Sequence, residues 1–236
     1  MKKALAIVGC DLPCCAVNKL SEDFHVVILP RDNKIAPQVS SHPDMILTVF
    51  DGKLFCHESY ALSNSDVLAE LCNLTGLELV PCKGERNAKY PADVAFNVLS
   101  LGERLIGRRD SMAAELLEYP IVNTRQGYAG CTSLFAGGCV ISADPSILKS
   151  ARRDGIPTEK ISGEGILLPG YDKGFIGGAC GVFGDTVYIC GDPSTCPAGL
   201  DLKKVCDELG LSLVSLVDGD VLDCGGIKFV PFSIEK

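Results

Sequence analysis

Three aspartates at corresponding places in the chain are the residues whose spacing first suggests chemistry. Asp44 and Asp93 each precede an alternating apolar segment, a glycine turn and a second apolar segment, so residues 40–59 and 89–108 resemble two copies of one hairpin. Asp223 precedes a similar segment near the C-terminus. Carboxylates around one channel repel each other unless a cation lies between them, and a guanidinium offers matching donors. The pattern predicts a cationic ligand; the alternative is that each aspartate caps a turn or accepts backbone donors.

A histidine and several cysteines add candidate catalytic groups. His42 lies two residues before Asp44, and in an extended strand the two side chains would face the same side. Such a pair can act as a general acid or base, although a single histidine is more often structural. Cys131 and Cys180 lie in glycine-rich stretches, where the backbone can approach a ligand closely, and Cys224 is a third candidate nucleophile. The alternative for all three is a small buried core thiol.

Two amides complete the predicted site. Asn97 lies inside the apolar run "VAFNVL", where a buried amide needs hydrogen-bond partners, and Gln126 adjoins a predicted strand. The predicted catalytic residues are His42, Cys131 and Cys180, and the predicted ligand-binding residues are Asp44, Asp93, Asn97, Gln126 and Asp223. We expect no metal and no other cofactor, because the cysteines lack the CxxC spacing of a zinc site and the glycines lack the Lys-Ser/Thr of a phosphate loop.

Composition and charge limit the possible partners. The 236 residues are 47% apolar and 22% charged, which is ordinary for a globular protein with a real core. A net charge of −8 disfavours nucleic acid and is compatible with a small cation. No apolar run reaches membrane-spanning length, and Asp11 and Pro13 interrupt the N-terminal one, which favours a buried strand over a signal peptide. Thirteen cysteines without a disulfide framework fit reduced thiols in a cytoplasmic protein.

Five repeated units must position these residues. Each has a helical stretch that runs into a short β-like segment, at residues 16–30, 66–81, 111–124, 146–162 and 200–216. A hairpin follows each of the first four units, but the fifth supplies only one strand, and the N-terminal strand at residues 2–9 can complete it by pairing with residues 227–230. We therefore predict a closed five-bladed α/β propeller of ββαβ-type repeats, as one domain over residues 1–236. The alternative is an open α/β sheet or two domains.

This architecture resembles the pentein fold of guanidino-group-modifying enzymes and of the ribosome anti-association factor. "HPDM" at residues 42–45 is similar to the His-x-Asp of arginine and agmatine deiminases, and "CGGIKF" at residues 224–229 is similar to their C-terminal segment before the nucleophilic cysteine. Two features differ: their His-x-Asp lies in a middle blade and here lies in the first, and Phe229 stands where their cysteine is expected. "QGYAGC" and "LPGYDKGFIGGACG" are similar to a bacterial branch of the fold with no assigned function.

The resemblance implies two functions. The first is binding or hydrolysis of a guanidino or related cationic small molecule in the central channel, by a deiminase-like enzyme acting on C–N bonds. The second is a non-catalytic pentein that binds a macromolecular partner, as the ribosome factor does. The carboxylates, His42 and the channel thiols favour the first, and Phe229 favours the second. The oligomeric state is left open.

Overall fold

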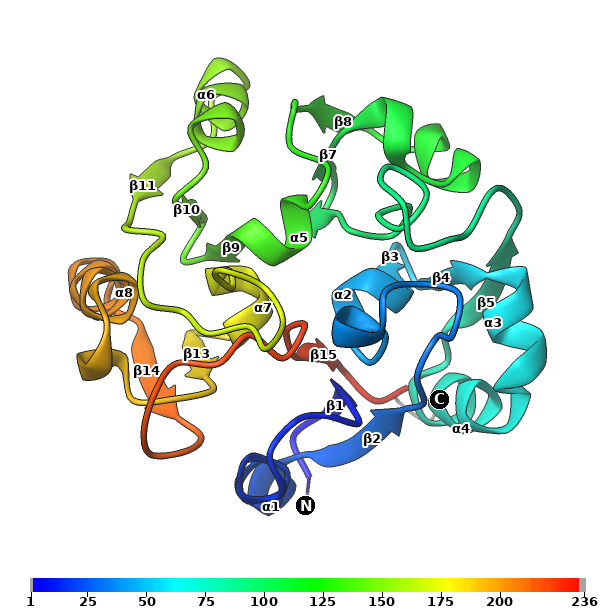
Figure 1. Ribbon diagram of the computed structural model, residues 1–236, viewed down its shortest axis with the longest axis horizontal. Helices are drawn as coiled ribbons and strands as arrows, with labels where there is room; N and C mark the ends of the chain where they lie inside the picture. The colour runs from blue at the N-terminus through cyan, green and yellow to red at the C-terminus, as the bar shows by residue number, and fades with distance from the viewer. Residues whose placement is uncertain (1, 234–236) are drawn as a thin grey trace.

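The computed structural model describes residues 2–233, and its strands form five three-stranded sheets set around a common centre (Figure 1). In each sheet an inner strand is antiparallel to a middle strand, which is parallel to an outer strand. From inner to outer, the sheets are β3 (Leu47–Phe50), β4 (Lys53–His57) and β5 (Glu78–Cys82); β6 (Leu99–Ser100), β7 (Leu105–Gly107) and β8 (Ile121–Asn123); β9 (Ser133–Ala136), β10 (Cys139–Ser142) and β11 (Thr158–Lys160); β12 (Cys180–Phe183), β13 (Thr186–Ile189) and β14 (Ser212–Ser215); and β15 (Lys228–Val230), β1 (Leu5–Gly9) and β2 (His25–Leu29). The four predicted hairpins are confirmed.

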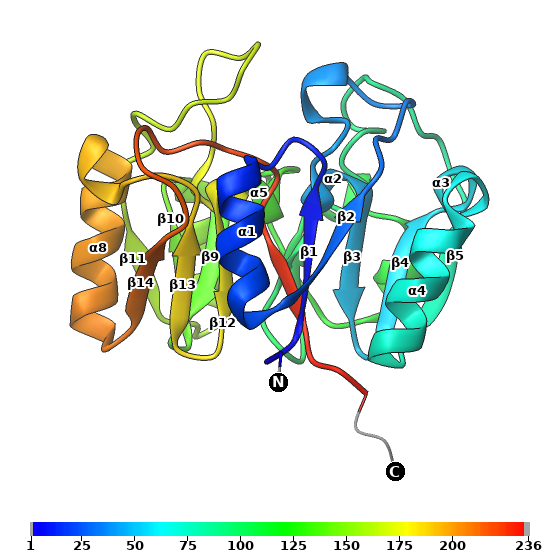
Figure 2. The ribbon, with the colours of Figure 1, turned by 90° about the horizontal axis from the view of Figure 1, so that it is seen from below.

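Helices connect the middle strand of each sheet to its outer strand on the outside of the assembly (Figures 1 and 2). They are α1 (Cys14–Asp23); α3 (Glu58–Ser63) and α4 (Ser65–Thr75); the 3-10 helices η2 (Arg109–Ser111) and η3 (Ala114–Glu118); α6 (Pro145–Arg153); and η4 (Pro193–Thr195) with α8 (Pro197–Leu209). The third predicted helical stretch forms only 3-10 turns, because the residue before Pro120 is driven into an extended conformation and the proline cannot continue a helix. None of the helices within residues 2–233 is long and apolar enough to cross a membrane.

The first and last strands of the chain lie in one sheet. β1 pairs with β15 in antiparallel register, with Leu5 opposite Val230 and Ala6 opposite Phe229. The pairing predicted between the two ends of the chain is therefore confirmed. It covers the edge that β1 would otherwise present to solvent.

Each inner strand begins after a compact turn that faces the centre. Three of these turns are short helices, α2 (Pro43–Ile46) before β3, α5 (Ala129–Thr132) before β9 and α7 (Ile176–Ala179) before β12. Glycine lets α5 and α7 touch, since a Cβ on Gly177 would lie 2.1 Å from the carbonyl oxygen of Gly130. The glycine-rich stretches thus serve the close approach of backbone to backbone.

Candidate functional site

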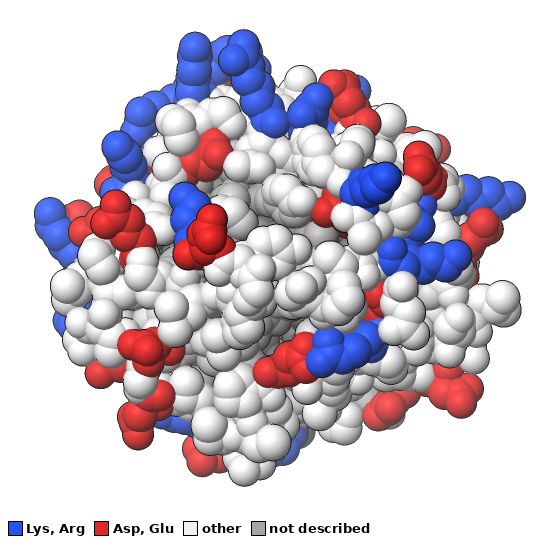
Figure 3. Space-filling view, in the orientation of Figure 1, with Lys and Arg blue, Asp and Glu red and all other residues white. Residues whose placement is uncertain are grey.

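Two adjoining cavities lie above the turns at the centre. The inner cavity, about 330 Å³, is lined by Asp93, Tyr128, Cys131 and the loop that precedes α7, and the outer cavity, about 610 Å³, lies beside it. They share His42, Leu168 and Asp223. Figure 2 shows the yellow-green segment between β11 and α7 standing above the sheets, and Figure 3 shows that uncharged atoms dominate the middle of this face. The charged groups of the site are therefore recessed.

His42 and Asp223 form a buried pair at the boundary of these cavities. His42 Nδ1 lies 3.7 Å from Asp223 Oδ1, and the two side chains are 5% and 1% exposed. Burial lowers the pKa of His42 to about 4 and raises that of Asp223 to about 6, although Gly225 and Phe175 donate backbone hydrogen bonds to the aspartate. At neutral pH the pair is a neutral imidazole beside a carboxylate. Asp223 thus accepts hydrogen bonds from backbone amides, which is the role that the alternative interpretation of the sequence gave to all three aspartates.

Asp44 lies in α2 and not in a strand, so the expectation that it shares a side with His42 is wrong. Pro43 begins the helix and the amides of Met45 and Ile46 bond to the His42 carbonyl, which turns the two side chains apart. Within residues 2–233 neither carboxylate oxygen of Asp44 has a hydrogen-bond partner. Burial and the nearby Asp223 raise the pKa of Asp44 to about 7, against the effect of Lys228. Asp44 therefore changes its charge near neutral pH.

Cys131 is the predicted nucleophile that the fold brings to the centre. Asn97 holds it on both sides: Nδ2 donates to Cys131 Sγ at 2.8 Å, and the Cys131 amide donates to Asn97 Oδ1 at 3.0 Å. The side chain is 5% exposed and lines the inner cavity. Burial, together with the charges of Asp44 and Asp223, raises its pKa well above the usual range. Burial and these two carboxyl groups therefore favour the protonated thiol.

Asp93 supplies a carboxylate oxygen with no partner inside the described chain. The Tyr128 hydroxyl donates to Oδ2 at 2.8 Å, and Oδ1 is buried without a hydrogen bond. Arg86 holds the same turn, because it donates to the Asp93 carbonyl at 2.8 Å and forms a buried ion pair with Asp32 at 2.9 Å. A buried acceptor without a donor is costly, so this oxygen suits a ligand that brings one.

The sequence interpretation missed three groups that support the site. Arg86 and Tyr128 form hydrogen bonds with Asp93, and Lys228 lines a cavity together with Asp44. Only Lys228 had a usable signal, as a charged residue within the short apolar strand β15. Its neighbours Ile227 and Phe229 pack in an apolar cluster, so the alternation of a strand directs Lys228 the other way, toward Asp44.

Two predicted site residues, Cys180 and Gln126, do not line the inner cavity. Cys180 packs in an apolar cluster between two sheets, and burial raises its pKa well above the usual range. Gln126 donates to Asp144 at 2.8 Å and accepts the Tyr128 amide, so it shapes the turn before α5 from outside the cavity.

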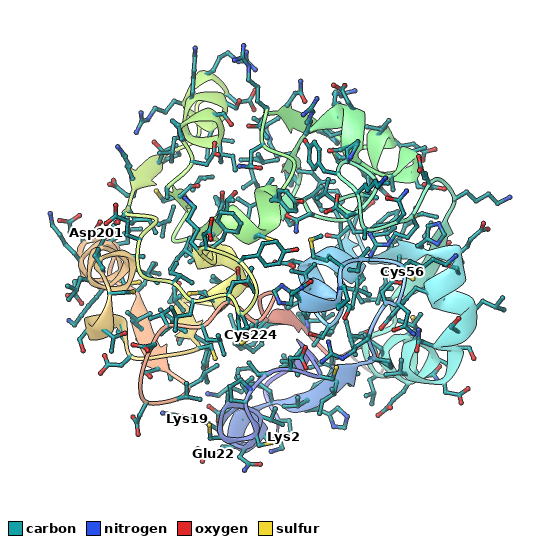
Figure 4. All side chains as sticks on the ribbon, viewed as in Figure 1. Lys2, Lys19, Glu22, Cys56, Asp201 and Cys224 are labelled. Carbon is teal, nitrogen blue, oxygen red and sulfur yellow. The ribbon has the colours of Figure 1, made fainter. Side chains whose placement is uncertain are left out.

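Cys224 and Phe229 have other neighbours. Cys224 lies near the centre in Figure 4, lines the outer cavity and places its sulfur 3.6 Å from that of Cys190. The Phe229 ring packs against Phe24 and Tyr188. Phe229 therefore fills an aromatic cluster at the position where the pentein enzymes are expected to carry their cysteine.

Comparison with known proteins identifies the fold. A family profile described as "Family of unknown function (DUF6873)" matches residues 7–228. Among solved structures, a DDAH from Pseudomonas aeruginosa in complex with citrulline has 10% identity and a TM-score of 0.57, over 92% of this chain and 93% of that one. The inosamine-phosphate amidinotransferase of Streptomyces griseus has 15% identity and a TM-score of 0.53, over 99% and 95%. An amidinotransferase of saxitoxin biosynthesis from Microseira wollei has 11% identity and a TM-score of 0.55, over 99% and 96%.

These structures share the pentein fold, and at such identities the likeness establishes the fold of this chain. The resemblance found in the sequence is confirmed at that level. A sequence search of curated proteins found no match.

Proposed function

Since the chain belongs to the DUF6873 family of unknown function and has the pentein fold, we propose that it binds a guanidino compound or a related small cation in the inner cavity and hydrolyses a C–N bond there. The observation that carries this proposal is the convergence of Asp93, Asp223, His42 and Cys131 on one cavity of about 330 Å³. The solved structures named above, two amidinotransferases and a complex with citrulline, support the same substrate class.

The charges around the inner cavity favour a cation. Asp93, Asp172 and Asp223 line it, whereas Lys173 is the one lysine among its lining residues within the described chain and His42 is neutral. The free Oδ1 of Asp93 accepts one more donor, and a guanidinium presents several in one plane. A planar cation would therefore satisfy an acceptor that is otherwise unpaired.

Cys131 is the nucleophile in this proposal. Its sulfur adds to the guanidino carbon, the C–N bond breaks, and the thiol proton ends on the nitrogen that leaves as ammonia or an amine. Water then adds to the carbon and the S–C bond breaks; one water proton returns to the sulfur, and the released ammonia or amine takes the other. A bound cation stabilises the thiolate, and the neutral imidazole of His42 accepts a proton from the attacking water.

The order of these residues along the sheets supports the assignment. The inner strands run β3, β6, β9, β12 and β15, with His42 before the first and Cys131 before the third. The resemblance places the enzymes' histidine in a middle blade and their cysteine near the C-terminus, so in this proposal both groups lie in earlier sheets. A nucleophile on an earlier sheet is compatible with Phe229 on β15.

We also propose that the five sheets form a closed five-bladed propeller in one domain. The pairing of β1 with β15 and the contacts between inner strands of neighbouring sheets support this arrangement. The inner cavity then lies on the axis of the propeller, where the segments that precede all five inner strands can contribute to one ligand.

The test is a turnover and binding assay under reducing conditions. The protein is mixed with arginine, agmatine and methylated arginines, and ureido product, ammonia and heat of binding are measured. Turnover should vanish in Cys131→Ala, and Asp93→Asn should weaken binding about 10- to 100-fold because a charged hydrogen bond is lost. Cys180→Ala should keep turnover, as should Cys72→Ala on α4. Turnover that survives in Cys131→Ala, or a complete lack of binding by all these cations, would refute the proposal.

A further inference from the structure

Two cysteines that the proposed reaction does not use lie against each other beside the site. The Cys224 thiol donates a hydrogen bond to the Cys190 sulfur at 3.6 Å, the one thiol–thiol hydrogen bond within residues 2–233. Cys190 is 1% exposed, whereas Cys224 is 6% exposed and lines the outer cavity, near the centre of Figure 4. A small oxidant that enters the outer cavity therefore reaches this pair of thiols at Cys224.

The backbone holds the two cysteines differently. Cys190 directly follows β13 and uses both of its backbone groups: its amide donates to the Ala179 carbonyl at 2.9 Å, and its carbonyl accepts the Leu222 amide at 2.8 Å. Cys224 lies between Leu222 and β15 in a segment that belongs to no strand, and its amide donates to the Gly178 carbonyl at 2.9 Å. A change at the two sulfurs therefore displaces the Cys224 segment more readily than the sheet.

The residues on either side of Cys224 both contact His42. Asp223 Oδ1 lies 3.7 Å from His42 Nδ1. Gly225, with a φ of 80°, packs flat on the same residue, since a Cβ at this position would lie 2.3 Å from the Cα and Cβ atoms of His42. The Gly225 carbonyl also accepts the Asp44 amide at 3.1 Å. A displacement of Cys224 is therefore passed on to His42 and to the start of α2.

We propose that Cys190 and Cys224 are an oxidative modification site, which a peroxide joins in a disulfide. The shift of Cys224 that follows loosens the hold of its two neighbours on His42. In the first step the Cys224 sulfur takes one peroxide oxygen and becomes a sulfenic acid, the O–O bond breaks, and the other oxygen leaves as water with the thiol proton. The Cys190 sulfur then attacks the Cys224 sulfur, the S–O bond breaks, and a second water leaves with the second thiol proton.

The movement that the disulfide requires is large for a buried segment. An S–S bond is about 2.05 Å long, so two sulfurs that lie 3.6 Å apart must approach by about 1.5 Å. Close-packed interiors transmit such a shift to the groups in contact, and Gly225 has no free space toward His42. The inference concerns the site of the proposed function, but the disulfide and its effect on α2 can be measured without a substrate.

The first measurement identifies the disulfide. The reduced full-length protein is treated with hydrogen peroxide, and peptide mass spectrometry without reduction locates the linked cysteines. A peptide pair joined through Cys190 and Cys224 should appear, lighter by two hydrogen atoms than the separate peptides, and dithiothreitol should reverse the link. A product in which these two cysteines are not joined to each other would overturn the inference.

The second measurement follows the Asp44 amide by hydrogen exchange, because this amide is bonded to the Gly225 carbonyl. Exchange at Asp44 should become about 10-fold faster in the oxidised protein, since about one backbone hydrogen bond is lost. The Leu148 amide on α6, bonded to the Asp144 carbonyl, is the internal control and should exchange at the same rate in both forms. A disulfide that leaves exchange at Asp44 unchanged would show that the pair is not coupled to the site.

Variants assign the response to this pair. Cys190→Ala should abolish both the disulfide and the faster exchange, and Cys224→Ala should do the same if Cys190→Ala does not fold, as thermal unfolding will show. The matched control replaces the three exposed cysteines, Cys10, Cys14 and Cys15, with serine and should keep the full response. Faster exchange that persists in Cys190→Ala would assign the effect to another thiol and overturn the inference.

A binding assay separates this inference from the proposed function. Any guanidino compound that the reduced protein binds should bind more weakly after oxidation and recover with dithiothreitol. If no guanidino compound binds the reduced protein, but oxidation joins the pair and speeds exchange at Asp44, the proposed substrate is refuted and this inference stands.

Discussion

Replacing Asp44 with asparagine should remove a pH-dependent destabilisation of the folded protein. Burial raises the pKa of Asp44 from its ordinary 3.8 to about 7. Over that interval the folded protein holds a proton that the unfolded chain has lost, so the free energy of unfolding falls as the pH rises through it. Asparagine has nearly the same shape and no such proton, and the fall should disappear.

The size of the effect follows from the shift. From 3.8 to about 7 is roughly three pH units, each worth about 1.36 kcal/mol, which sets an upper value of about 4 kcal/mol. Because Asp223 interacts with Asp44 and shares its proton binding, we expect about 2–4 kcal/mol. His42 acts in the opposite sense: burial lowers its pKa from 6.5 to about 4, so stability is lost as the pH falls through that range, equally in both proteins.

Urea unfolding of the wild type and Asp44→Asn, at intervals from about pH 4 to about pH 8, measures the difference directly. The stability of the variant relative to the wild type should grow by about 2–4 kcal/mol across this range, with little further growth above the upper end. Asp207→Asn, at an exposed ion pair on α8, is the matched control and should differ by a nearly constant amount of less than about 1 kcal/mol. A constant difference for Asp44→Asn as well would refute the raised pKa of Asp44.

Three further predictions concern groups around the site. Arg86→Met should destabilise the protein by about 3–5 kcal/mol in urea unfolding, because it leaves a buried carboxylate unpaired; a loss below about 1 kcal/mol would contradict the buried ion pair. Asn97→Ala should lower the free energy of unfolding by about 2 kcal/mol, because two hydrogen bonds to Cys131 are lost. Cys131 is then held less firmly, so turnover should fall by more than the loss of folded protein explains. When the protein is oxidised with diamide, Cys190 and Cys224 should form the first disulfide, because their sulfurs lie 3.6 Å apart. Peptide mass spectrometry identifies the pair, and another pair appearing first would show this prediction to be wrong.

Much of the fold could be predicted because it depends on local chemistry. Alternating apolar residues and glycine turns define the hairpins, and Gly76 and Gly210 end α4 and α8 with φ values of 71° and 69°, as helix C-termini require. Arg152 and Arg153 lie in the last turn of α6, where they interact favourably with the helix dipole, and Asp144 caps the start of the helix. The 3-10 turns before Pro120 were not predicted, because a short apolar run carries little information on helix type.

The candidate site could be predicted only in part. His42, Asp44, Cys131 and Asp223 were identified because polar groups before apolar strands stand out in the sequence. The direction of each side chain could not be predicted, since one turn of helix at α2 sends His42 and Asp44 into different cavities. A short polar loop gives no sign that it will form a buried ion pair, which is why Arg86 was missed.

The sequence by itself determined the five repeated units, the pairing of the chain's two ends and the presence of carboxylates and thiols before the inner strands. These depend on patterns within about ten residues, where side-chain alternation and turn chemistry act directly. Only the tertiary structure decided which of those groups meet and which are charged. Asp44, Cys131 and Lys228 come from α2, α5 and β15, and their protonation depends on burial and on charges that are distant in sequence.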